Sequence, residues 1–244
     1  KLEGTSFNGC SSLKSVTLPS ALNSTGNYGS AFAFDNTGVE SVKVNGLYVS
    51  TDKNGNEANV IVVKSDNALR YSVSPNILPN IATVTYHCIK AQSVTDFNIP
   101  ASVTAINANS FSNLTIKNIY SASTATIPAT AFSATDKTKA KVYVASDAIK
   151  AKFVAAGFTE ANIKVATGQC GAGMYYYVNG KKLIIFGGGA MYTGSSLDKT
   201  WGAKASTFTS IEFKGTAITS ISASAFASCT AVKGAIEIPA SVTS

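Results

Sequence analysis

Apolar and polar residues follow one repeated order along much of the chain. Each of the segments 106–111, 127–132 and 221–226 begins with an isoleucine and ends, five residues later, with a phenylalanine. A fixed apolar rhythm of about 21 residues is typical of a solenoid, in which each repeat is too small to bury its own apolar face and stacks on its neighbours. The pattern therefore predicts stacked repeats and favours a binding surface over an enzyme.

The repeated unit continues beyond the phenylalanine with a polar turn and a short strand. The first copy spans residues 7–19 and ends in Val16-Thr17-Leu18-Pro19. Because side chains alternate along a strand, Val16 and Leu18 are predicted to face the core while Thr17 points outward. Pro19 cannot donate a ladder hydrogen bond and should end the pairing. Copies side by side would form a parallel sheet of very short strands.

Two stretches of this unit resemble a known family. Residues 7–22 (FNGCSSLKSVTLPSAL) and 218–244 (ITSISASAFASCTAVKGAIEIPASVTS) are similar to the BspA-like leucine-rich repeats of bacterial surface proteins, and the resemblance covers residues 1–44, 94–144 and 205–244. It implies an α/β-type solenoid, mainly β: an irregular leucine-rich repeat right-handed superhelix with short parallel strands, β-hairpin insertions and one capping helix. Variable turn lengths and an apparent insertion at residues 23–30 predict an irregular horseshoe.

The first of two predicted modules covers residues 1–166. Residues 45–93 leave the repeat pattern, and a hairpin insertion is expected there, with strands at 46–49 and 60–63. Residues 144–166 are expected to form a helical cap. Its helix spans 148–156, with Ser146 or Asp147 as N-cap and Gly157 as the stop, followed by a strand at 163–165.

The second predicted module covers residues 167–244. Strands at 174–178 and 181–186 flank Asn179-Gly180, a pair that favours a type I′ hairpin turn, and the glycines 187–189 should end the hairpin. A second repeat array then begins near Phe208. Since the chain opens inside a repeat, we expect it to be an internal piece of a longer protein.

Composition narrows the class of protein and its location. Charged residues make up only 14% of the chain, which suits an extracellular or cell-surface repeat protein. The net charge of +7 is scattered, with one loose cluster at Lys137, Lys139, Lys141, Lys150 and Lys152, so we interpret it as solvated surface and expect no nucleic-acid partner. No apolar run approaches the ~18 residues of a membrane span. A monomer is expected.

Residues capable of catalysis or metal binding are few and badly spaced. His87, the single histidine, is followed by Cys88, whose side chain would point to the opposite face of a strand. The glycines 187–189 lack the Lys-Ser/Thr ending of a phosphate loop, and residues 52–56 lack the closing glutamate of a calcium loop. The sequence therefore predicts no enzyme, no cofactor and no metal. Cys10, Cys88, Cys170 and Cys229 show no zinc spacing and are expected to be free, buried thiols.

The outward positions of the repeat strands are the remaining candidates for function. One outward row comprises Thr17, Lys43, Asn98, Tyr120, Tyr143, Glu212 and Glu237, and the row beside it comprises Ser15, Ser41, Asp96, Asn118, Lys141 and Ser210. Tyr120 and Tyr143 should be adjacent and flanked by Asn118 and Lys141, and tyrosines are common anchors of interfaces and sugar platforms. These four residues form the predicted partner-binding site. The alternative is that the two tyrosines only fill β positions.

The resemblance implies adhesion. We expect a non-enzymatic cell-surface or secreted leucine-rich repeat protein that binds host or extracellular-matrix proteins through its concave face. The alternative is a glycan-binding or spacer region of a larger secreted protein; tyrosine pairs in the concave face would favour glycan binding and a bland polar face would favour a spacer.

Overall fold

In the part of the chain that it describes, the computed structural model is built mainly of short strands, arranged in four sheets. It describes residues 6–7, 9–18, 41–44, 60–63, 68–72, 77, 81–84, 88–89, 92–193, 201–215 and 217–243. Towards the N-terminus, β1 (Ser15–Leu18) pairs in parallel with β2 (Ser41–Val44), and Thr17 lies opposite Lys43. This register is the one predicted from the repeat unit.

A central parallel sheet carries the best-formed repeats. Its order is β10-β9-β8-β6, and its strands are β6 (Gln92–Ile99), β8 (Leu114–Ser121), β9 (Lys141–Val144) and β10 (Ile163–Val165). In β8, β-branched and aromatic residues dominate, as is usual for strands. Asp96 lies opposite Asn118 and Asn118 opposite Lys141, while Asn98, Tyr120 and Tyr143 form the parallel row. Both predicted rows are therefore confirmed across these three strands.

The repeated phenylalanines form the centre of the core beneath this sheet. The ring centroids of Phe97 and Phe111 are 5.0 Å apart, and those of Phe111 and Phe132 are 4.8 Å apart. Phe132 also contacts Phe158 at 5.4 Å in an edge-on arrangement. Phe111 and Phe132 close two copies of the repeated phrase that are 21 residues apart, so the sequence period places the ring of one repeat against the ring of the next.

Residues 81–84 belong to a repeat layer, although the sequence pattern assigns them to an insertion. β5 (Thr83–Val84) pairs in parallel with β7 (Ala105–Ile106), and the Ser110 hydroxyl donates to the Val84 carbonyl at 2.9 Å. On its other edge β5 pairs with β4 (Ala68–Ser72), which forms an antiparallel hairpin with β3 (Val60–Val63). The strand predicted at 60–63 is confirmed, but the partner that the structure describes for it is β4; the partner strand predicted at 46–49 lies outside the described residues.

The predicted cap agrees closely with the structure. Helix α1 (Asp147–Ala155) is capped by Ser146, whose hydroxyl accepts a hydrogen bond from the Ile149 N–H at 3.4 Å. Gly157 ends it in the left-handed region at φ +92°. A 3₁₀ turn, η1 (Glu160–Asn162), leads into β10. Ile149 and Phe153 are buried, so the helix closes the phenylalanine core.

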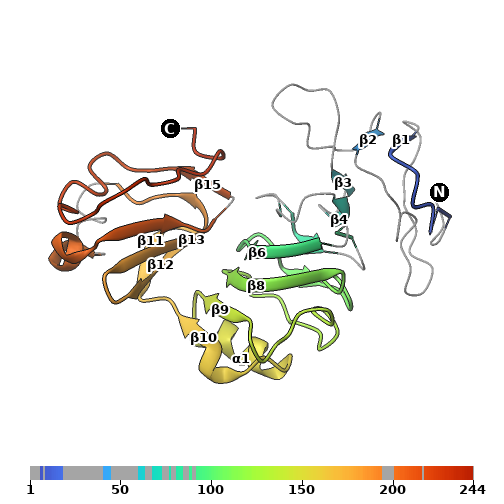
Figure 1. Cartoon of the computed structure of the whole chain (residues 1–244), viewed down its shortest axis with the longest axis horizontal. Helices are drawn as coiled ribbons and strands as arrows, with labels where there is room; N and C mark the ends of the chain where they lie inside the picture. Colours follow the sequence, from blue (N-terminus) through green and yellow to red (C-terminus); the bar gives the residue numbers. More distant parts are fainter. Residues whose placement is uncertain are drawn as a thin grey trace.

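Another sheet follows the cap and lies across from the central parallel sheet in the curved molecule (Figure 1). We call the central parallel sheet the first sheet and this one the second sheet. Its strands are β11 (Gly168–Gly171), β12 (Met174–Asn179), β13 (Lys182–Ala190), β14 (Ser210–Phe213) and β15 (Ala217–Ser220), with the 3₁₀ segment η2 (Gly202–Thr207) before β14. β12 and β13 form the predicted hairpin, and β14 and β15 pair in parallel with β13.

Two details of this hairpin correct the sequence analysis. Asn179 pairs with Lys182, so the two-residue turn is Gly180-Lys181, and only Gly180 has a positive φ, of 59°. A glycine at the first turn position is the pattern of a type II′ turn, not type I′. The β12–β13 pairing ends at Gly187, opposite Met174, as predicted, but strand β13 does not end at Phe186: it continues to Ala190 and pairs there with β15.

Candidate functional site

The two tyrosines of the predicted site are adjacent, as expected. Tyr120 lies opposite Tyr143 in the register of β8 and β9, and their rings stack with centroids 4.9 Å apart and planes 10° apart. Asn118 and Lys141 face each other two residues earlier on the same strands. The parallel register thus brings all four predicted residues together.

The tyrosines are nevertheless not exposed, which corrects the expectation of an open aromatic platform. Tyr120 retains 3% of its accessible surface and Tyr143 retains 9%. The β12–β13 hairpin covers them: Phe186 lies 6.0 Å from Tyr120 and Tyr177 lies 5.5 Å from Tyr143, between ring centroids. Ile184 belongs to the same buried cluster. In this structure the two rings join the two sheets.

A polar network borders the aromatic contact. The Asp96 carboxylate accepts hydrogen bonds from the Asn118 amide at 2.9 Å and from the Tyr120 hydroxyl at 3.4 Å, and it pairs with Lys214 at 2.9 Å. Lys214 also lies 3.4 Å from Glu212, which pairs with Lys182. The network therefore links the first sheet to β13, β14 and the residue after β14.

The protonation equilibria of this network reflect its burial and its charges. Burial raises the pKa of the Tyr120 hydroxyl, and the negative charge of Asp96 adds to the effect. Burial also raises the pKa of Tyr143. For Glu212, burial opposes ionisation, but Lys182 and Lys214 outweigh it and lower its pKa. For Lys214, burial favours the neutral form, but Asp96 and Glu212 prevail and raise its pKa. At neutral pH the tyrosines are thus neutral while Glu212 and Lys214 are charged.

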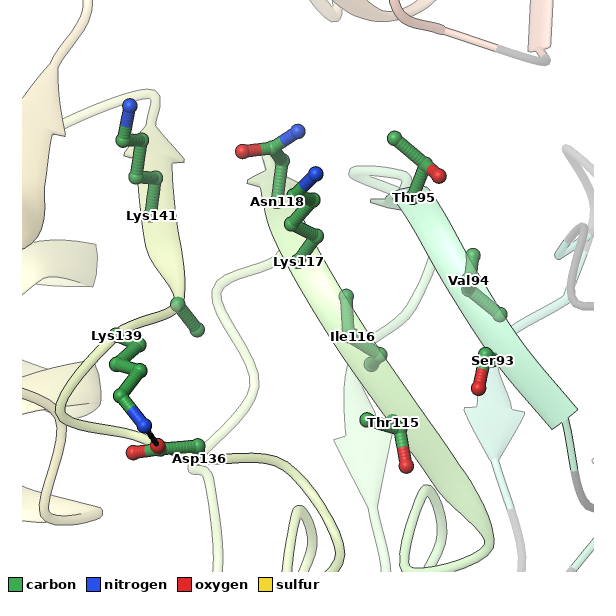
Figure 2. A pocket seen from close by; sticks show the side chains of 11 residues that line it. Ser93, Val94, Thr95, Thr115, Ile116, Lys117, Asn118, Asp136, Lys139 and Lys141 are labelled. Atoms are coloured by element: carbon green, nitrogen blue, oxygen red, sulfur yellow. Dashed lines mark ion pairs between the residues drawn. The ribbon is translucent and has the colours of Figure 1, made fainter.

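A groove crosses the first halves of β6 and β8 and the start of β9 (Figure 2). Its volume is about 660 Å³. We call it the basic groove, and its lining residues are Ser93, Val94, Thr95, Thr115, Ile116, Lys117, Asn118, Asp136, Lys139, Ala140 and Lys141. Asn118 and Lys141 of the predicted site line it, whereas Tyr120 and Tyr143 do not.

Three lysines and one aspartate supply the charges of the basic groove. Lys139 pairs with Asp136 at 2.9 Å. Hydrogen bonds from Thr138 and then Lys139 lower the pKa of Asp136 to about 2, and Asp136 raises the pKa of Lys139. Within the described part of the chain, Lys117 and Lys141 have no ion-pair partner. The groove therefore keeps an excess of positive charge.

Sequence reasoning missed Lys117, Lys139 and Thr95 as possible site residues. The predicted outward rows begin at the position of Asp96. The groove, however, also includes Thr95 and Lys117, which come one residue before Asp96 and Asn118 on their strands. Lys139 was interpreted as part of a solvated cluster. The signal that could have found the groove is the spacing of Lys117 and Lys141, because strands about one repeat apart lie side by side.

The described residues show little else with reactive chemistry. Among them, no group of three His, Cys, Asp or Glu side chains could hold a metal ion. His87 lies outside the described residues. Cys88 and Cys170 are buried as predicted, and burial raises the pKa of the Cys170 thiol to about 12. Cys10 is exposed and Cys229 only half-buried, contrary to the prediction, because the turn after the repeat phenylalanine lies nearer the surface than expected.

Comparison with known families agrees with this architecture. The BspA type leucine rich repeat region matches the chain in six copies, over residues 1–55, 72–152 and 203–244. The chain belongs to this family. The match includes β5, the strand that pairs in parallel with β7 of the repeat after it. Neither the curated proteins nor the solved structures that were compared give a match.

The family gives a coarse statement of function. Repeats of this type form a module that is generally non-enzymatic and that suggests protein binding. Within the described residues, no helix is both long and apolar enough to cross a bilayer.

Proposed function

We propose that the chain is a protein-binding region of a cell-surface or secreted protein, and that it attaches to host or extracellular-matrix proteins through the outward face of its parallel sheet. The repeats form a right-handed superhelix, divided at residue 166 into two arrays. Solenoids of stacked repeats bind partners across rows of outward side chains. The observation that carries the proposal is the basic groove, which crosses three consecutive repeat strands.

The four predicted site residues have different roles in this proposal. Asn118 and Lys141 line the groove and contact the partner. Tyr120 and Tyr143 hold the β12–β13 hairpin against the sheet, and so fix the edge of the face that the partner meets. Because the tyrosines are covered, glycan binding through an aromatic platform has less support than protein binding.

The test is a binding screen of the purified chain against extracellular-matrix proteins and mucin-type glycans. The variant Asn118→Ala/Lys141→Ala removes two groove side chains, and Lys164→Ala removes one charge from the neighbouring strand β10, outside the groove. We expect a matrix protein to bind the chain and Lys164→Ala equally, and to bind the double variant at least about tenfold more weakly. A glycan as the sole ligand, or no ligand at all, would contradict the proposal; the second result would favour a spacer.

A further inference from the structure

The floor of the basic groove is apolar and closely packed. Val94, Ile116 and Ala140 line it from three neighbouring repeats and retain 9%, 4% and 3% of their accessible surface. Such a floor gives an apolar side chain a place to rest but offers few hydrogen bonds. Thr95, Thr115 and Asn118 supply polar groups around it.

Charge is unevenly distributed around this floor. Lys139 forms an ion pair with Asp136, whereas Lys117 and Lys141, on adjacent strands, have no ion-pair partner in the described part of the chain. Figure 2 shows their side chains extending in the same direction, away from the Asp136–Lys139 pair. Two such ammonium groups attract a ligand with at least two negative charges.

We propose that the basic groove binds an extended, acidic polypeptide segment of the partner. Carboxylates of the segment pair with Lys117 and Lys141, and an apolar side chain between them rests on Val94 and Ile116. An apolar residue flanked by acidic residues matches both the apolar floor and the two lysines, whereas a sulfated glycan matches the lysines alone. Among the residues that the structure describes, no aromatic side chain lines the groove, so they offer no stacking surface of the kind on which sugars commonly rest. This inference rests on the proposed protein-binding function.

The test uses the full chain and a fluorescein-labelled peptide of repeated Glu-Leu-Glu, measured by fluorescence anisotropy at low and moderate salt. We expect Lys117→Gln/Lys141→Gln to weaken binding about tenfold, since each exposed charge pair contributes a modest factor. Raising the salt should weaken binding to the unaltered chain more than binding to the variant. The control Lys164→Gln/Lys204→Gln removes the same charge from exposed positions outside the groove and should bind as the unaltered chain does.

Three results would overturn the inference. In the first, the two double variants bind the acidic peptide equally well. In the second, the unaltered chain binds a peptide with Gln in place of Glu as well as it binds the acidic peptide. In the third, a heparin-derived oligosaccharide binds in a way that depends on Lys117 and Lys141, while the acidic peptide does not bind. A matrix protein that binds regardless of Lys117 and Lys141 would reject the acidic segment yet leave the protein-binding function standing. The absence of any protein ligand would reject the function itself.

Discussion

At the scale of single residues, two of the three copies of the repeated phrase share an unusual backbone conformation. Asn109 and Ser224 hold the same position, three residues after the phrase's isoleucine, and both lie in the left-handed region, at φ 55° and φ 60°. This region costs most L-residues roughly 1–2 kcal/mol, and asparagine tolerates it best. Thr130, at the same position of the copy 127–132, has no positive φ, so the conformation recurs in two copies and not in every one, and Ser224 fits it less well than Asn109 does.

Replacing Ser224 with glycine should stabilise the protein. Ser224→Gly removes the strain of the left-handed conformation, and the gain should exceed glycine's greater loss of chain entropy by roughly 0.5 kcal/mol. Urea unfolding would measure the change. Ala223→Gly is the matched control, since Ala223 is exposed and has no positive φ, and it should destabilise the protein. Equal destabilisation by both substitutions would show that the turn imposes no strain.

At the scale of elements, local patterns predicted the strands and the helix well. The α1 cap at Ser146, the stop at Gly157 and the pairing of Asn118 with Lys141 follow from local chemistry and the repeat period. The extension of strand β13 beyond Phe186 does not follow from local patterns, because a glycine run is typical of a strand end unless a neighbouring segment passes close by. Here β15 pairs with Gly188 and Gly189, a long-range contact with no local signal.

Gly187 and Gly189 of β13 are required for different physical reasons. Gly187 and Gly189 both have φ +92°, but a Cβ on Gly187 would lie 2.2 Å from the Gly173 carbonyl oxygen, whereas a Cβ on Gly189 would meet nothing within 4 Å. Gly187→Ala should therefore destabilise the protein by about 1–3 kcal/mol more than Gly189→Ala, which bears only the conformational strain. Thermal unfolding of the two variants measures this difference. Equal losses would mean that the close approach to Gly173 relaxes without cost.

At the scale of the whole molecule, the second sheet lies against the outward face of the first. The local repeat pattern places Tyr120 and Tyr143 outward but cannot say what covers them. A sequence signal for the cover does exist in Leu183-Ile184-Ile185-Phe186, an unbroken apolar run. Such a run is typical of a strand buried on both faces: Leu183 and Ile185 pack in the second core, while Ile184 and Phe186 pack on the tyrosines.

The contact between the two sheets should be sensitive to alkaline pH. The pKa values of Tyr120, Tyr143 and Lys214 are all raised in the folded protein, from ordinary values of 10.0 for tyrosine and 10.5 for lysine. A group whose pKa is raised by folding contributes stability that is complete below its unfolded pKa and is lost as the pH rises through the folded pKa. The contact should therefore be intact at neutral pH and weaken above about pH 10. Small-angle scattering should then show expansion, and absorbance at 295 nm should show tyrosine ionisation.

A conservative double substitution separates the tyrosine hydroxyls from the other alkaline effects. Tyr120→Phe/Tyr143→Phe keeps both stacked rings and removes the two hydroxyls, whose ionisation the buried contact opposes. Among the described residues, the variant loses the 3.4 Å hydrogen bond from Tyr120 to Asp96. Since burying a phenolate is costly, the variant should keep its compact dimensions to a higher pH than the unaltered chain. Lys214 then sets the remaining pH dependence, because its pairs with Asp96 and Glu212 persist until it loses its proton. If both proteins expanded at the same pH, the transition would be due to Lys214 alone. The tyrosine hydroxyls would then contribute nothing to the pH dependence of the contact.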